Sequence, residues 1–65
     1  MIIDVNAEGT EVAAATLDAL VAELGHEPDA VATALNGEFV PRAERAAAFL
    51  KGGDRVEILS PMQGG

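Results

Sequence analysis

Two consecutive glycines, Gly64 and Gly65, stand at the end of the sequence and are its strongest candidate for chemistry. Glycine has no Cβ, so the backbone of another protein can approach it closely. Two glycines in succession can thread a narrow channel and present the Gly65 carboxylate to the phosphate of a nucleotide. Residues 60–65 are expected to form an extended, mobile tail, which is where such an end would have to lie.

The side chains offer no comparable pattern. His26 is the only histidine, and we expect it at the surface, just after the end of a helix. The acidic residues do not follow the spacing of a calcium loop, and Gly52-Gly53 lacks the residues of a phosphate-binding loop. We therefore predict no catalytic side chain and no metal site.

Composition points to a carrier or binding module and argues against a self-contained enzyme. A chain of 65 residues fits one domain with a thin core, which leaves little room for a substrate cavity. There is no cysteine, as suits a reducing cytoplasm, and the chain cannot hold sulfur as a persulfide. The formal charge of −7 disfavours nucleic acid and anionic membranes and favours a basic partner surface. We expect neither a signal peptide nor a membrane span, because the start lacks basic residues and no apolar run approaches ~20 residues.

The first half of the chain predicts a hairpin followed by a helix. Residues 1–6 alternate as in a half-buried strand, 7–9 form a turn around Gly9, and 10–12 form a second strand. Thr16 is a good N-cap, and Gly25 suits the residue just past the helix C-terminus. The apolar residues between them share one helical face: Leu17, Leu20, Val21 and Leu24.

The second half predicts another hairpin, a short helix and a last strand. Asn36-Gly37 favours a type I′ turn, which would pair Leu35 with Glu38 and Ala34 with Phe39. Four residues of this hairpin would then face the core, namely Val31, Thr33, Leu35 and Val40, and Phe39 would face the other way. A short helix or turn is expected over 42–48, after which Phe49 and Leu50 return to the core. A turn at 52–54 precedes a strand over 55–59, with Val56 and Ile58 inward.

This order of elements predicts an α+β fold of the β-grasp type. A mixed sheet of four or five strands packs against one main helix, with one further short helix, in two layers. The domain would span residues 1–59 and the tail residues 60–65. Phe39 and Leu59 are the candidates for an exposed apolar surface that a partner could cover.

Two segments and the chain end resemble the ThiS family of ubiquitin-like sulfur carriers of the thiamine pathway. Residues 34–42, ALNGEFVPR, are similar to the family pattern A-h-N-x-x-h-V-P-R, where h is apolar. Residues 53–59, GDRVEIL, are similar to its G-D-x-V-E-I strand, and Gly64-Gly65 complete the pattern. The resemblance covers essentially the whole chain. It departs at 46–48, three alanines where some relatives have a tryptophan, and at Pro61, which stiffens the base of the tail.

The resemblance implies a carrier cycle with separate partner enzymes. A ThiF-like adenylyltransferase would use ATP and magnesium to convert the Gly65 carboxylate to an acyl-adenylate. A sulfur donor, such as a cysteine desulfurase, would leave a terminal thiocarboxylate for a ThiG-like thiazole synthase. Gly65 would be the only reacting residue, while Gly64, Gln63 and Met62 thread the partner's channel. The chain itself would bind no cofactor.

Three alternatives remain open from the sequence. The G-D-x-V-E-I strand and the glycine pair also occur in the small subunit of molybdopterin synthase. A ubiquitin-like protein modifier or interaction domain has the same fold. An inert β-grasp domain could end in two glycines by chance.

Overall fold

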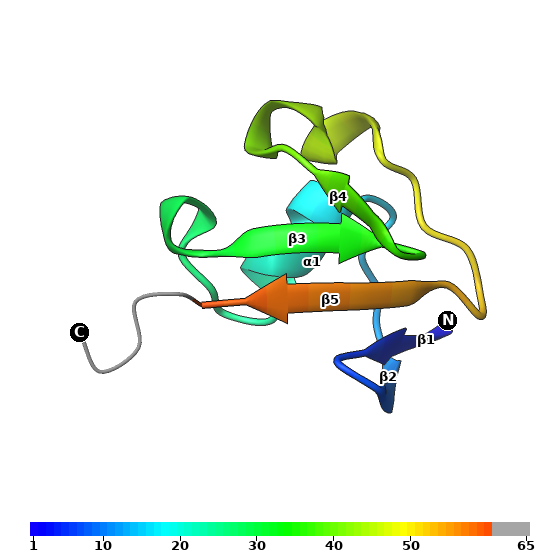
Figure 1. The fold of residues 1–65 in the computed structure, drawn as a ribbon. Helices are drawn as coiled ribbons and strands as arrows, with labels where there is room; N and C mark the ends of the chain where they lie inside the picture. The colour runs from blue at the N-terminus through cyan, green and yellow to red at the C-terminus, as the bar shows by residue number, and fades with distance from the viewer. Residues whose placement is uncertain (61–65) are drawn as a thin grey trace.

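The computed structural model describes residues 1–60 as one five-stranded mixed sheet with a helix on one face. The elements, in chain order, are β1 (Ile2–Val5), β2 (Glu8–Glu11), α1 (Leu17–Glu23), the 3₁₀ helix η1 (Pro28–Ala30), β3 (Ala32–Leu35), β4 (Glu38–Val40), the 3₁₀ helix η2 (Arg42–Ala47) and β5 (Arg55–Leu59). The strand order is β2-β1-β5-β3-β4, so the last strand lies at the centre of the sheet. It runs parallel to β1 and antiparallel to β3, as Figure 1 shows.

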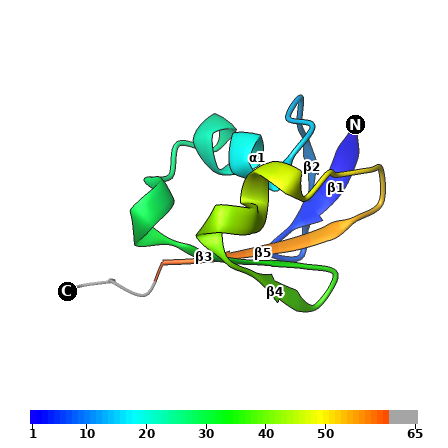
Figure 2. The same cartoon turned by 90° about the horizontal axis from the view of Figure 1, so that it is seen from above.

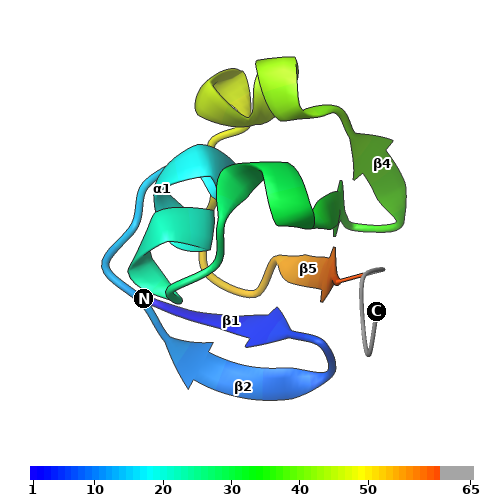
Figure 3. The ribbon, with the colours of Figure 1, turned by 90° about the vertical axis from the view of Figure 1, so that its left-hand side faces the viewer.

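The sheet curves around α1, which is the grasp that the sequence predicts. Figure 2 shows α1 and η2 on the same side of the sheet, and Figure 3 shows the strands wrapping from β2 to β4 around the helix. The opposite side of the sheet carries no helix in the part of the chain that the structure describes. The core therefore lies on the side of the sheet that faces α1 and η2.

The first hairpin turns earlier than the sequence predicts. Val5 pairs with Glu8, so the loop consists of Asn6 and Ala7, both with positive φ, and the predicted turn around Gly9 is wrong. Gly9 lies inside β2, where its φ is not positive. Asn tolerates the left-handed conformation, whereas Ala rarely adopts it, so the sequence signal favoured the glycine two residues later.

The predicted helix is confirmed at both ends. The Thr16 hydroxyl accepts a hydrogen bond from the Ala19 N–H at 3.2 Å, which caps the first turn. At the other end Gly25 has φ +83°, and the N–H of His26 donates to the Val21 carbonyl at 3.0 Å. Together with the bond from Gly25 N–H to the Ala22 carbonyl, this is a Schellman motif. The three residues of α1 that are buried against the sheet are Leu17, Leu20 and Val21.

The second hairpin has the predicted register. Leu35 pairs with Glu38 and Ala34 with Phe39, across an Asn36-Gly37 turn with positive φ at both residues. The predicted core face is also confirmed, because Val31 and Thr33 are buried and Leu35 and Val40 pack against the core cluster. Phe39 points to the open face.

The short helix η2 places an arginine in the core, which the sequence did not suggest. Arg45 is only 2% exposed and donates three hydrogen bonds to neutral acceptors. They are the Thr33 hydroxyl at 3.0 Å, the Pro28 carbonyl at 2.9 Å and the Val31 carbonyl at 2.7 Å. Thr33 in turn donates to the Val40 carbonyl at 2.9 Å, so one arginine ties η1, β3 and β4 to η2. The planar guanidinium suits this role because its donors point in fixed directions.

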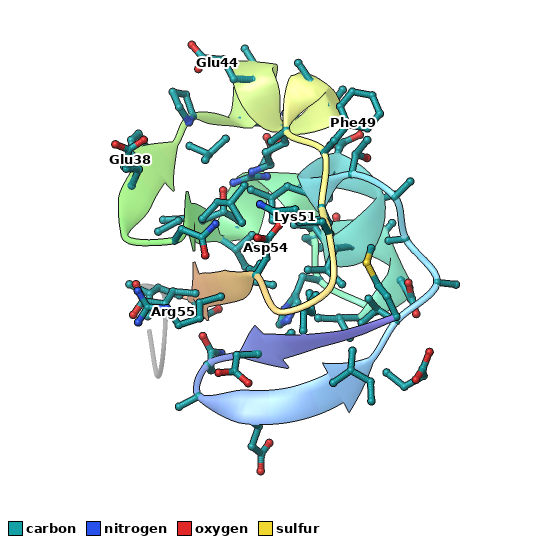
Figure 4. All side chains as sticks on the ribbon, turned by 90° about the vertical axis from the view of Figure 1, so that its right-hand side faces the viewer. Glu38, Glu44, Phe49, Lys51, Asp54 and Arg55 are labelled. Atoms are coloured by element: carbon teal, nitrogen blue, oxygen red, sulfur yellow. The ribbon has the colours of Figure 1, made fainter. Side chains whose placement is uncertain are left out.

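The prediction that both Phe49 and Leu50 enter the core is half wrong. Leu50 is buried, but Phe49 is 71% exposed. Residues 48–50 run extended beside the start of α1, with Thr16 bridged to Phe49 and the Leu50 N–H donating to the Ala15 carbonyl. Adjacent residues of an extended chain point to opposite sides, so only one of the two can face the core. Figure 4 shows Phe49 projecting from the outside of the molecule.

Candidate functional site

The central strand β5 connects the folded body to the predicted reactive end. Val56 and Ile58 point into the core, as predicted, and Leu59 is the last strand residue. The residues expected to react or to thread a partner, Gly65, Gly64, Gln63 and Met62, lie outside the described part of the chain and stay predictions. The division into a domain of residues 1–59 and a tail of residues 60–65 stays a prediction as well. The structure thus defines the base from which the last residues leave.

The start of β5 is fastened by a buried carboxylate, Asp54. Its oxygens accept from the Lys51 backbone N–H at 2.9 Å, from the Asn36 side-chain amide at 3.1 Å and from the Lys51 ammonium at 3.3 Å. Figure 4 shows Lys51 and Asp54 side by side beneath the chain that leads into β5. The Lys51 backbone bond, followed by that from Asn36, lowers the pKa of Asp54 below its ordinary value.

This lowered pKa predicts an acid-dependent contribution to stability. A carboxylate whose pKa is depressed in the folded state stabilises the fold fully above its unfolded pKa and loses that contribution as the pH falls through the folded pKa. We expect Asp54→Asn to be less stable than the parent at neutral pH, with a difference that shrinks below about pH 4. Urea unfolding from pH 7 to pH 2.5 measures the difference. A gap that is constant over this range would contradict the assignment.

An apolar patch lies on the open face of the sheet, beside the end of β5. Phe39 on β4 stands opposite Ala34 on β3, and Ala32 on β3 stands opposite Leu59 on β5. Alternation along β3 places all four side chains on one face. Phe39 is 68% exposed and Leu59 62% exposed, with only the methyl groups of the two alanines between their strands. We call Phe39, Ala34, Ala32 and Leu59 the outer patch.

The open face beside the outer patch carries charged side chains. Glu57 lies directly opposite Ala34, and alternation along β5 places Arg55 on the same face. Glu38, by contrast, pairs with the inward-facing Leu35 and belongs to the other side. Glu57 and Arg55 are both exposed. An apolar centre with a polar, charged rim is the usual anatomy of a protein interface. The predicted exposure of Phe39 and Leu59 is therefore confirmed, and the fold brings them onto one surface.

The described residues contain no enclosed site. Between residues 1 and 60 the surface has no pocket, and no three side chains of His, Asp or Glu gather in a way that could hold a metal ion. In the same range, no helix combines the length and the apolar character needed to cross a membrane.

Two side chains that make structural hydrogen bonds to the backbone were not singled out from the sequence. The Asn6 amide contacts Ile58 near the end of β5, and the Glu23 carboxylate accepts from the backbone N–H groups of Ala13 and Ala14. Glu23 thereby fixes the loop that enters α1. For Asn6 a signal exists, because a second asparagine, Asn36, occupies the same position in the other hairpin.

Within residues 1–60, a five-stranded mixed sheet that curves around one α-helix and has β5 at its centre defines a ubiquitin-like β-grasp protein. Residues 3–65 match the ThiS family. The crystal structure of the thiamine biosynthesis protein (ThiS) from Geobacter metallireducens superposes with a TM-score of 0.82 at 33% identity, covering 100% of both chains. The solution structure of a thiamine biosynthesis protein from the same organism gives the same score and identity, over 100% of this chain and 88% of the other.

The chain belongs to the ThiS family, whose members are small sulfur carriers in thiamine biosynthesis. No curated protein sequence matches it. The resemblance noted in the sequence is confirmed, and the β-grasp fold with it.

Proposed function

We propose that this chain carries sulfur on the carboxyl carbon of Gly65 and delivers it to thiazole formation. One observation carries the proposal: the match to the ThiS family runs through Gly65, so the glycine pair falls inside the matched segment. The structure supports it by placing β5, the strand that leads to this segment, at the centre of the sheet. The body would then act as a rigid handle for a reactive end.

The chemistry requires activation, because a carboxylate is a poor electrophile. A Gly65 carboxylate oxygen attacks the α-phosphorus of ATP, pyrophosphate leaves, and a mixed anhydride with AMP forms. A sulfur nucleophile at the oxidation level of hydrosulfide then attacks the carbonyl carbon. AMP leaves with the bridging oxygen, the proton of the hydrosulfide passes to solvent, and a thiocarboxylate remains. The sequence contains no cysteine, so no thiol of the chain competes for the activated carbonyl.

Partner enzymes supply everything except the carbonyl group. In this proposal a ThiF-like adenylyltransferase binds ATP and magnesium. A donor such as a cysteine desulfurase supplies sulfur as a persulfide, and a thiol reductant cleaves the S–S bond, which brings this sulfur to the hydrosulfide level. A ThiG-like thiazole synthase receives the sulfur. The cycle would take place in the cytoplasm. Gly64, Gln63 and Met62 would occupy the partner's channel, where the missing Cβ of Gly64 gives clearance next to the reacting carbon.

The outer patch is the surface with which the body would dock. Its exposed aromatic side chain and its position beside the end of β5 suit a partner that also receives the chain end. The net charge of −7 favours a basic surface around an apolar pocket on that partner. Docking through the patch would bring residues 60–65 to the activating site.

If the outer patch is the docking surface, alanine substitutions of two similarly exposed phenylalanines should affect the KM of the adenylyltransferase very differently. Phe39→Ala is expected to raise the KM of the adenylyltransferase for this carrier about tenfold, because a buried aromatic anchor contributes over ~1 kcal/mol to an interface. Phe49→Ala, in a side chain 71% exposed and outside the patch, is expected to leave KM unchanged. Neither change should alter unfolding by more than about 0.5 kcal/mol. Steady-state pyrophosphate release measures KM, and equal effects of both variants would remove the patch from the proposal.

Intact mass tests the carrier function itself. The purified chain is incubated with the adenylyltransferase, ATP, magnesium and sulfide. Exchange of one oxygen for sulfur adds about 16 Da, which is also the gain from methionine oxidation, so the reaction without ATP is the essential control. An ATP-dependent gain supports the carrier. An unchanged mass with an active enzyme contradicts it, and a ladder of isopeptide-linked proteins in a cell extract would indicate a protein modifier instead.

A further inference from the structure

Two asparagines hold the central strand at its two ends. Asn6 and Asn36 each occupy the first position of a two-residue hairpin loop, each with φ +51°. The side chain of Asn36 accepts from the Arg55 N–H at 2.9 Å and donates to Asp54 at 3.1 Å, where β5 begins. The side chain of Asn6 accepts from the Ile58 N–H at 2.9 Å and donates to the Ile58 carbonyl at 3.2 Å, where β5 is about to end.

Asn6 replaces strand pairing that β1 no longer provides. Along this side of β5 the Asp4 N–H donates to the Asp54 carbonyl and the Asn6 N–H to the Val56 carbonyl, both at 2.9 Å. The next partner in the parallel ladder would be Ile58, but β1 has ended at Val5 and turned away. The side-chain amide of Asn6 therefore makes the two hydrogen bonds to the Ile58 backbone that a longer β1 would provide.

The two asparagines differ in the part of β5 that each one holds. Asn36 fastens the start of β5, which is already held by Asp54 and its partners. Asn6 fastens the last inward-facing residue before the chain leaves the sheet, since only Leu59 of β5 follows. On the other side, β3 pairs with β5 as far as Leu59. Without the Asn6 side chain, the end of β5 would be hydrogen-bonded on one side only. A strand end with few hydrogen bonds unfolds locally more readily than the rest of the sheet.

We propose that Asn6 is a positioning residue for sulfur transfer: its amide fixes Ile58, so that residues 60–65 leave the sheet at a constant point relative to the outer patch. This role rests on the proposed function. A partner that binds the patch and the chain end together needs both in one arrangement. When the end of β5 opens, only a fraction of the free carrier is competent, and the apparent dissociation constant rises by the reciprocal of that fraction.

Asn6→Gly and Asn36→Gly form a matched pair of variants. Glycine accepts positive φ, so each variant keeps its hairpin loop and removes two side-chain hydrogen bonds at one end of β5. Amide hydrogen exchange reads the local effect without any partner. In Asn6→Gly the Ile58 amide is expected to exchange at least about tenfold faster, while in Asn36→Gly the faster amide is that of Arg55.

Kinetics with the adenylyltransferase then separate positioning from plain stability. Asn6→Gly is expected to raise KM for the carrier about three- to tenfold with little change in kcat, because a bound chain end is held by the enzyme. Asn36→Gly should leave KM unchanged, although both variants lower the unfolding midpoint. Asn6→Asp, which keeps the acceptor for Ile58 but loses the donor, should fall between Asn6→Gly and the parent.

Each contrary result has a distinct meaning. Equal KM values for Asn6→Gly and Asn36→Gly overturn the positioning role and leave the carrier function standing. An unchanged exchange rate of the Ile58 amide in Asn6→Gly would show that the Asn6 side chain does not hold the end of β5. A parent chain that gains no sulfur from an active adenylyltransferase overturns the proposed function and this role with it.

Discussion

Deleting Gly65 is expected to abolish thiocarboxylate formation and to leave the free energy of unfolding within about 0.5 kcal/mol of the parent. The shortened chain still ends in a carboxylate, but that group stands one residue, about 3.5 Å, short of the nucleotide. A displacement of only ~1 Å at a reacting centre can cost about a hundredfold in rate. Pyrophosphate release and intact mass measure the loss, and thermal unfolding measures the stability.

Two controls show whether the loss is specific. Gly52→Ala changes a glycine at a position without positive φ and with no atom within 4 Å of an added Cβ, so it should neither unfold the chain nor impair activation. The chain lacking Gly65 retains the outer patch and should inhibit activation of the parent competitively. Full activity without Gly65, or a large loss of stability, would show that the chain end is not the sulfur holder.

Replacing Leu20 by alanine is expected to have the largest effect on stability, a loss of about 2–5 kcal/mol. Leu20 is 0% exposed and belongs to the hydrophobic core cluster between α1 and the sheet. A chain of this size has roughly 3–10 kcal/mol of stability in total, so the loss is a large part of what holds it folded. Urea unfolding at 25 °C measures the change.

The matched control lies on the other side of the same helix. Ala22 is exposed, and Ala22→Ser should cost no more than about 0.5 kcal/mol, the difference in helix propensity. A cost below about 1 kcal/mol for Leu20→Ala would mean that this helical face is not the core of the domain.

The parts of the fold that the sequence predicted correctly are those with strong local signals. The Asn36-Gly37 loop determines the register of β3 and β4, because a two-residue loop is compatible with only one pairing of the two strands. The helix has a cap at Thr16, an apolar stripe and a glycine at its end, and each signal agrees with the others. Alternation in β5 was sufficient to assign Val56 and Ile58 to the core.

The errors arose where tertiary contacts override local preference. The Asn6-Ala7 loop carries no glycine, and the bonds from Asn6 to Ile58 join residues 52 positions apart in the chain. Phe49 looked like a core residue by type, but the backbone pairing of residues 48–50 with the start of α1 turns it outward. The burial of Arg45 depends on three acceptors from distant segments, which no pattern around position 45 reveals.

The candidate site also contains features that the sequence predicted and features that it did not. The exposure of Phe39 and Leu59 followed from strand alternation, and the structure places both on one surface. The hydrogen bonds from Asn6 to Ile58 could not be predicted from the sequence, because they join residues far apart in the chain. The chemistry assigned to Gly65 rests on the family match and on the reactivity of a carboxylate, so it calls for a chemical test.

The most direct test locates the sulfur atom. After reaction with the adenylyltransferase, ATP and sulfide, trypsin cleavage after Arg55 releases the peptide of residues 56–65, which tandem mass spectrometry can sequence. We expect a gain of about 16 Da on the fragment that contains Gly65 alone, with fragments of residues 56–64 unchanged. A gain located on Met62, where oxidation adds a similar mass, or an unmodified peptide after ATP has been consumed, would contradict a sulfur carrier that works through its terminal carboxylate.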